Sequence, residues 1–213
     1  MSFLTAQYPG FELIEAETEL ILNVKGYRSL TPLQTGNSVP QFTFANNFNS
    51  WQQFFNGAET HNHIPIRQIL SKPLVIAFYA QQWGRAGTDF LKQLNAINPE
   101  IRANGGNLVV VTQVSNPELQ KAAWDNNLTI NFYIDADHQL AKQFGIYHQN
   151  SPVWERFSGI DAHVPLLAAF VTTPYHQIIF DHTNWDMDKP FLADALLDEV
   201  YQSSLSINTR KSA

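Results

Sequence analysis

The sequence predicts an α/β domain built on a mixed central sheet. Two apolar runs of strand length, residues 73–80 and 108–114, have the composition of strands that are buried on both faces. Between them, apolar residues from Phe90 to Ile101 recur at spacings of four, three and four, which is the pattern of an amphipathic helix. A strand, helix and strand in this order require a right-handed crossover between two parallel strands.

The rest of the chain continues the alternation of strands and helices. The further predicted elements are a helix opened by residues 115–119, a short strand at 130–134, a helix at 137–144, a hairpin of 168–173 and 176–182, and a last helix that follows residues 188–190 and buries Phe191, Leu192, Leu196 and Val200. A β-α-β unit, an inserted helix and a final β-β-α unit together make a thioredoxin-like architecture. The hairpin adds antiparallel strands to the parallel ones, so the sheet is mixed.

We expect the chain to divide into three segments. Residues 1–32 form an N-terminal extension that is helical over 11–24, residues 33–203 form the thioredoxin-like domain, and residues 204–213 form a flexible polar tail. Within the domain, the amide-rich stretch 46–62 has the composition of an irregular insertion. Its aromatic residues predict that it packs against the core.

Charge and hydropathy exclude several classes of partner. The 13 basic and 19 acidic residues give a net charge of −6, and no basic run is longer than Arg210-Lys211, so we expect no nucleic-acid partner. The longest apolar stretches have strand length, which is far short of the ~20 residues of a membrane span. The first ten residues lack the features of a secretory signal. We therefore expect a soluble protein of the cytoplasm with no membrane partner.

The chain contains no cysteine. Disulfides, thiolate nucleophiles, redox dithiols, cysteine-bound zinc and iron–sulfur clusters are therefore all excluded. The polar residues are instead dominated by amides, with 18 Asn and 16 Gln.

Five segments resemble the peroxiredoxin-like redoxins of the AhpC/TSA family. They are residues 33–44, 64–70, 72–79, 134–145 and 164–171, which correspond in order to the family's opening motif, short helix, first core strand, Asp-to-Gly helical segment and last buried strand. The resemblance covers about residues 33–203. It implies the same thioredoxin-like fold that the strand and helix pattern predicts.

The resemblance also shows where the reactive group of such proteins would stand. These redoxins carry W-C-x-x-C at the start of a helix, where the helix dipole and unpaired N–H groups lower the pKa of a thiol. This chain has Trp83-Gly84-Arg85-Ala86-Gly87 there, so both cysteine positions are glycine, and Thr88 and Asp89 follow as expected helix-start residues. Leu167 stands where the family has a proline.

We therefore expect a cysteine-less, peroxiredoxin-like protein without thiol peroxidase or disulfide chemistry, acting as a binding or scaffold protein. The expected ligand site is the degenerate redox site, formed by Trp83, Gly84, Arg85, Gly87 and Thr88. Unpaired backbone N–H groups and a guanidinium would suit a small anion or carboxylate there, with the indole as an apolar wall. A second copy of the chain is the other candidate partner. The sequence implies no cofactor.

The alternative function is an enzyme with non-thiol chemistry, of which a metal-dependent reaction is one form. His61 and His63 are two residues apart, and a second group is near the hairpin, consisting of His176, Asp181, His182, Asp186 and Asp188. Neither group has a recognised ligand spacing, so no metal ligand is assigned. Asp135 and Asp137 are expected to serve as a turn and helix cap.

Overall fold

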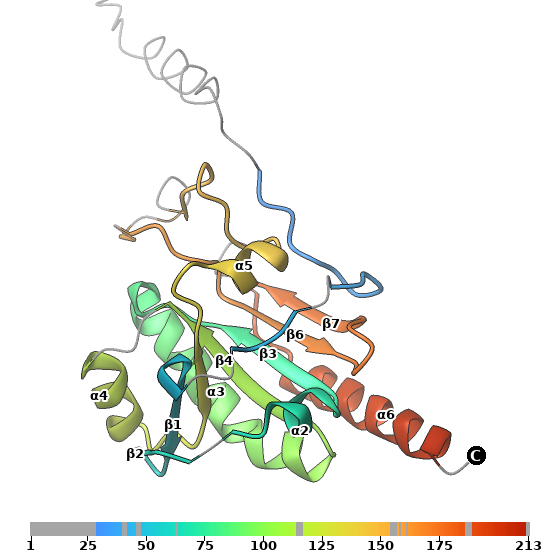
Figure 1. Ribbon diagram of the computed structural model, residues 1–213. Helices are drawn as coiled ribbons and strands as arrows, with labels where there is room; N and C mark the ends of the chain where they lie inside the picture. The colour runs from blue at the N-terminus through green and yellow to red at the C-terminus, as the bar shows by residue number, and fades with distance from the viewer. Residues whose placement is uncertain are drawn as a thin grey trace, which may run out of the picture.

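The chain folds around a seven-stranded mixed sheet (Figure 1). The computed structural model describes residues 29–39, 42–45, 48–62, 64–113, 117–153, 157, 159–160, 162–185 and 189–211. The strands are β1 (Trp51–Phe55), β2 (Ala58–Thr60), β3 (Leu74–Phe78), β4 (Asn107–Thr112), β5 (Asn131–Ile134), β6 (Ala168–Thr172) and β7 (Ile178–Thr183). Their order across the sheet is β2-β1-β5-β4-β3-β6-β7. The predicted mixed sheet is thus confirmed.

Helices cover the sheet and connect its parallel strands. They are α2 (Ile66–Leu70), α3 (Gly84–Ala103), α4 (Pro117–Asp125), α5 (Gln139–Gln143) and α6 (Ala193–Lys211), with 3-10 turns at Phe48–Ser50 and Gln81–Trp83. Helices α3 and α6 pack against each other on one side of the sheet, as Figure 1 shows. No helix of the described residues has the length and apolarity needed to cross a membrane.

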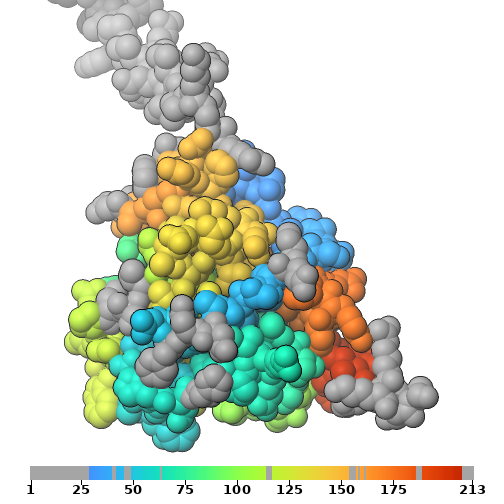
Figure 2. All heavy atoms as spheres, in the orientation of Figure 1, coloured from blue at the N-terminus to red at the C-terminus, as the bar shows by residue number. Residues whose placement is uncertain are grey.

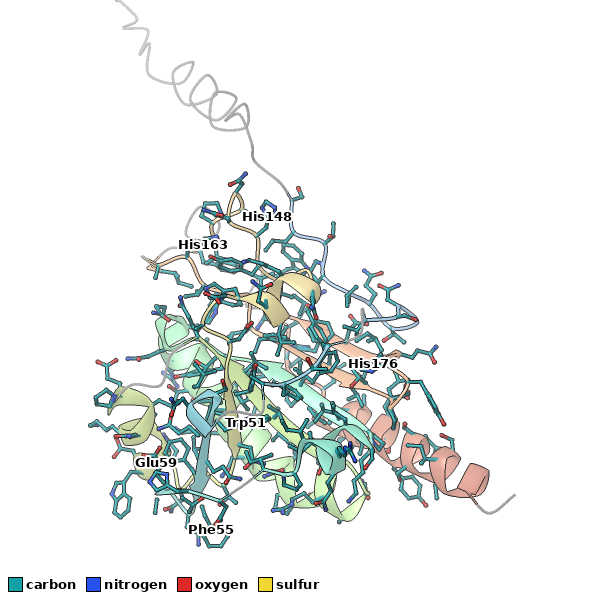
Figure 3. The ribbon with its side chains drawn as sticks, in the orientation of Figure 1. Trp51, Phe55, Glu59, His148, His163 and His176 are labelled. Atoms are coloured by element: carbon teal, nitrogen blue, oxygen red, sulfur yellow. The ribbon has the colours of Figure 1, made fainter. Side chains whose placement is uncertain are left out.

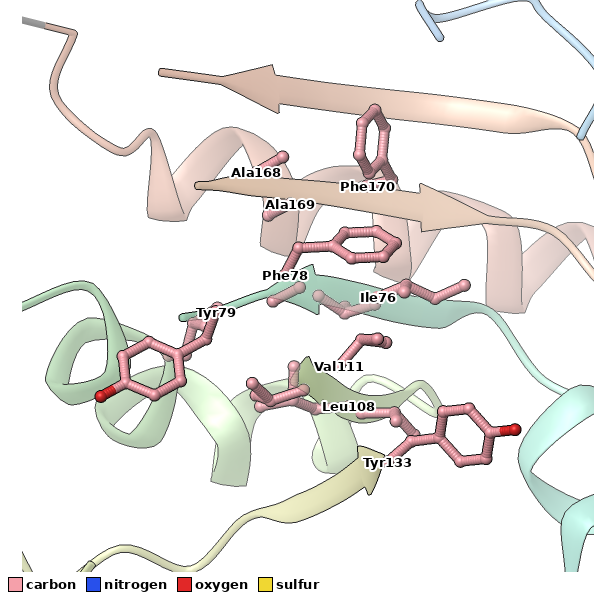
Figure 4. Close-up of a cluster of buried hydrophobic side chains, with 14 of the residues drawn as sticks. Ile76, Phe78, Tyr79, Leu108, Val111, Tyr133, Ala168, Ala169 and Phe170 are labelled. Carbon is pink, nitrogen blue, oxygen red and sulfur yellow. The ribbon is translucent and has the colours of Figure 1, made fainter. Parts of the chain in front are cut away.

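Strand β3 lies inside the sheet and is buried at all five residues. It pairs in parallel with β4 and antiparallel with β6, so Ile76 faces Val109 on one side and Phe170 on the other. Above the strand, the Phe78 ring lies 5.2 Å from that of Phe144 and 6.1 Å from that of Phe170, measured between centroids. Figure 4 shows Phe78 and Phe170 facing each other across the two strands. The sequence prediction of a buried, interior strand at 73–80 is confirmed.

The stretch 46–62 is not the irregular insertion that its amide content predicted. Residues 51–60 form the β1–β2 hairpin, which extends the sheet by pairing β1 antiparallel to β5. Asn56 and Gly57 form its turn with φ of 48° and 80°, which is the backbone that two-residue hairpin turns need. The Asn-Gly pair was the sequence signal for this hairpin. Figure 2 shows the hairpin beside α4 at the surface, in agreement with the contact between α4 and β2.

The polar segment 204–213 was expected to be a tail, but α6 continues through it to Lys211. Ser203 is buried, and Gly105 leaves room for Ser204 to approach the end of α3, so the helix has contacts to pack against. Leu196 and Val200 are fully buried, as predicted, whereas Leu192 precedes the helix and is exposed. The helix predicted over 11–24 lies outside the described residues.

Residues 29–32, which we assigned to the N-terminal extension, lie against the body of the domain. Leu30 is buried, and the backbone N–H of Leu33 donates to the carbonyl oxygen of Phe144. The closest approach is at Gly145, where an added Cβ would lie 2.0 Å from the carbonyl oxygen of Thr31. Gly145 also has a φ of 69°, so it ends the α5 segment in a conformation that favours glycine.

We predict that Gly145→Ala destabilises the protein by about 3 kcal/mol or more, because it adds a clash with residue 31 to the strain of a positive φ. Gly36→Ala is the matched control, since Gly36 has a φ of 91° and no atom within 4 Å of its added Cβ. The free energy of unfolding of the control should fall by only about 1 kcal/mol. Urea unfolding measures both variants, and equal losses would show that the contact with Thr31 contributes nothing.

Candidate functional site

The expected site lies where β3 leads into α3. The 3-10 turn Gln81–Trp83 joins the helix directly, and α3 begins at Gly84 rather than near Thr88. Gly84 makes this join possible with φ 55° and ψ −125°, a combination that residues with a Cβ rarely adopt. Its backbone N–H donates to the carbonyl oxygen of Gln81, so this N–H group is not available to a ligand.

Trp83 does not form the apolar pocket wall that the sequence suggested. Its side chain is buried, its Nε1–H donates to the carbonyl oxygen of Pro165 at 2.9 Å, and its ring packs edge-to-face on Phe157 at 5.0 Å. The indole therefore anchors the start of α3 to the segment that leads into β6. Tryptophan buries well only where its N–H finds such an acceptor, and here the acceptor is 82 residues away in the sequence.

The two glycines at the expected cysteine positions differ in their surroundings. An added Cβ at Gly87 would lie 3.0 Å from a Tyr79 ring carbon and 3.1 Å from the Cβ of Trp83. An added Cβ at Gly84 would meet nothing within 4 Å, but the positive φ there strains any side chain. A side chain at Gly87 would crowd its neighbours, and a side chain at Gly84 would strain the backbone. Neither position therefore accepts a cysteine without a local shift.

The remaining site residues lie toward the surface. The Arg85 side chain is 94% exposed, and its Nε lies 3.4 Å from the Asp89 carboxylate one turn later. The Thr88 hydroxyl donates to the carbonyl oxygen of Gly84 at 3.0 Å, so it acts within the helix and not as an N-cap. The structure therefore brings Gly84, Arg85 and Thr88 together on the first turns of α3, while Trp83 and Gly87 point into the protein.

A small hollow of about 190 Å³ lies beside this part of α3. Ala86, Asp89 and Phe90 form one wall, and Leu167 and His182 are on the opposite side. No sequence pattern indicates this arrangement, because His182 is about 95 residues from this part of α3 and reaches it only through the β6–β7 pairing. Burial, and then the charge of Lys189, lowers the pKa of His182.

Three aromatic rings form a stack near α5, and one of them, His163, is labelled in the upper part of Figure 3. The Tyr147 ring lies between those of His138 and His163, with centroid distances of 3.9 Å and 4.3 Å and nearly parallel planes. Burial lowers the pKa of both histidines, and it outweighs the opposing effect of Asp135 on His138. The carboxylate of Asp135 accepts the backbone N–H groups of Gln139 and Ala141, which confirms its predicted role as a helix cap.

The histidine pairs singled out from the sequence form no metal centre in the described part of the chain. No three His, Asp or Glu side chains there are placed to hold a metal ion. His61 is exposed, and His176 has a φ of 60° in the hairpin turn, where it packs on Phe42. His63, Asp186 and Asp188 lie outside the described residues.

A profile of the AhpC/TSA family matches residues 35–181. Among solved structures, the peroxidoxin BcpB of Mycobacterium tuberculosis is similar at 16% identity and TM-score 0.52, over 82% of this chain and 98% of that one. The mitochondrial 2-Cys peroxiredoxin of Plasmodium falciparum is 12% identical with TM-score 0.56, over 82% and 96%. AhpC of Enterococcus faecalis is 17% identical with TM-score 0.55, over 82% and 95%. No curated protein matches the sequence. The structural likenesses confirm the thioredoxin-like fold.

We predict that the protein loses stability as the pH falls below about 6.5, because His138, His163 and His182 have pKa values lowered by burial. Below that pH the unfolded chain takes up protons that the folded chain does not. Each histidine then costs on the order of 1 kcal/mol per pH unit until its folded pKa is reached. Urea midpoints measured across this range test it. His138→Asn should flatten the dependence and His61→Asn, at an exposed position, should not; a midpoint that stays constant would contradict the prediction.

Proposed function

Since the chain belongs to the AhpC/TSA family, we propose that it is a member that acts by binding and not by catalysis. The chain has no cysteine, so it lacks the group that performs thiol peroxidase or disulfide chemistry. No other side chain occupies the two positions, because glycine has none. What remains is a complete redoxin frame with an altered site at the start of α3.

The observation that carries this proposal is the packing around Gly87. Tyr79, Trp83 and the carbonyl oxygen of Ala80 all lie within 3.3 Å of the point where a Cβ would stand. A side chain there would force these neighbours to move by a few tenths of an ångström. A site from which only the sulfur had been removed would retain room for it, so the close contacts indicate a structure adjusted to glycine.

We further propose that the exposed part of this site, formed by Gly84, Arg85 and Thr88, binds a small anion or carboxylate, with Trp83 and Gly87 holding the helix start in place. The Arg85 guanidinium offers forked donors to a carboxylate, and the positive end of the α3 dipole adds to its charge. In the ion pair that Arg85 forms with Asp89, the aspartate side chain is 48% exposed. Such pairs contribute little, so a ligand can compete for the arginine.

The alternative, a metal-dependent enzyme at His61 and His63, has no observation in its favour among the described residues.

We predict that the purified protein shows no thioredoxin- or glutathione-coupled turnover of hydrogen peroxide above a buffer blank.

We also predict that the double variant Gly84→Cys/Gly87→Cys is less stable by about 2–5 kcal/mol, from backbone strain at one position and overpacking at the other. Ala86→Cys is the matched control, since it adds a thiol to the same helical turn at a half-buried position, and should stay close to wild type. Turnover by metal-free wild-type protein, or a double variant of unchanged stability, would contradict the proposal.

We predict that citrate raises the melting temperature of the wild-type protein more than that of Arg85→Ala, because the guanidinium supplies the only full positive charge among the site residues. Arg67→Ala is the matched control, since Arg67 is also exposed but lies on α2. Thermal shifts at constant ionic strength measure the effect. Identical citrate responses in all three proteins would exclude a site at Arg85.

A further inference from the structure

A second hollow, of about 350 Å³, lies at the far end of α3. It is lined by the carboxyl-terminal half of α3, by β1 and β2, and by residues at the starts of β4 and β5. Arg102, at its rim, is 18 residues after Gly84 on the same helix. At 1.5 Å per residue, about 27 Å separates it from the degenerate redox site. The hollow is therefore independent of the site described above.

The strand register explains why polar side chains gather at this hollow. Gln53 of β1 faces Thr60 of β2 on one side and Asn131 of β5 on the other, so the three residues form a row on one face of the sheet. Helix α3 packs over β4 and brings Asn98 and Arg102 to the edge of this row. The sheet extends past the helix there, which leaves the row uncovered.

The lining has an unusual chemistry for a pocket of this size. It contains amides, hydroxyls and one arginine, but no acidic side chain. The amides are Gln53, Asn62, Asn98, Asn107 and Asn131. Amides and hydroxyls both donate and accept hydrogen bonds, which is the pairing that a ligand rich in hydroxyl groups requires.

The protein fixes the orientation of three of these amides by binding their NH₂ groups. Gln53 donates to the side-chain oxygen of Asn131 at 2.9 Å, Asn98 donates to the carbonyl oxygen of Thr129 at 2.6 Å, and Asn107 donates to the carbonyl oxygens of residues 68 and 69. The oxygen of each amide is left to accept from elsewhere. That of Gln53 is enclosed by the protein and accepts no hydrogen bond from the described residues, a state that costs about 1–3 kcal/mol.

Two exposed side chains complete the rim. The Arg102 guanidinium makes no ion pair within the described residues, where the two salt bridges lie at Arg85 and Lys121. Phe55 is 60% exposed at the end of β1 and projects from the lower edge of the molecule in Figure 3. The rim thus offers one forked cation and one aromatic face.

From these groups we propose that the hollow binds a small sugar acid, a polyhydroxylated ring that carries one carboxylate. Its hydroxyl groups donate to the oriented oxygens of Asn98 and Asn107. Its carboxylate pairs with Arg102, the single charge of the lining, and its C–H face packs on Phe55. Inorganic phosphate fits poorly, because it brings acceptors to the oxygens of Asn98 and Asn107, which also accept.

The test is a titration of the full chain with glucuronate, glucose and acetate, followed by the amide signals of ¹⁵N-labelled protein. We expect glucuronate to shift signals in residues 53–62, 98–107 and 129–131 with a Kd on the order of 1 mM, a value that its small size sets. Glucose lacks the carboxylate and acetate lacks the hydroxyls. Each should bind at least about tenfold more weakly.

Two substitutions separate the contributions of the charge and of the aromatic ring. Both are at exposed positions, so neither disturbs the packing of the core. Arg102→Gln should weaken glucuronate about tenfold and bring it level with glucose, since it removes the charge. Phe55→Ala should weaken both sugars about threefold. Arg67→Gln is the matched control and should bind as wild type does. Absence of a saturable shift, equal binding of glucose and glucuronate by wild type, or an unchanged Kd in Arg102→Gln would each overturn the proposal.

Discussion

The burial of strand β3 is the constraint on which the rest of the structure depends. All five of its residues are inside the protein, and it is hydrogen-bonded to β4 on one side and β6 on the other. Its direction therefore fixes where the chain leaves the sheet, which is next to Tyr79 and Ala80. The start of α3 must be built against these two residues. The geometry at Gly84 and Gly87 follows from this placement, because the helix can only approach the end of the strand as closely as its side chains allow.

Glycine at these two positions changes the packing as well as the chemistry. Without a Cβ at Gly87, the first turn of α3 settles against the ring of Tyr79. Without one at Gly84, the 3-10 turn runs into the helix through a positive φ, and the turn carries Trp83 inward to its bond with Pro165. Each contact depends on the others. The backbone at Gly84 and the packing at Gly87 thus both fit glycine, which agrees with the absence of thiol chemistry that the missing cysteines imply.

Much of the frame could be predicted from the sequence, because its signals are local. The apolar run at 73–80 and the hairpin around Pro174-Tyr175 carry their own composition and turn residues. The site was harder to predict, because its contacts involve residues that are far away in the sequence. Nothing near Trp83 in the sequence indicates that its acceptor is Pro165, and nothing near α3 indicates His182. The hairpin at 51–60 was missed for a different reason: its amide content outweighed the Asn56-Gly57 signal, although turn residues are the more direct evidence.

The two ends of α3 face opposite physical demands, which explains why they differ in chemistry. Its start fits against the buried end of β3, so Trp83 and Gly87 make their contacts within the protein, while Arg85 on the outer side is exposed. Its last turns lead to the start of β4, and the β1–β2 hairpin widens the sheet beyond the part that α3 covers. The polar row of Gln53, Thr60 and Asn131 lies in that uncovered part. Since backbone carbonyls and neighbouring amides hold the side chains there, their acceptor oxygens are fixed before any ligand arrives, and binding need not order them. A redoxin frame without thiols at the start of α3 thus has a preorganised polar surface at the other end of the same helix.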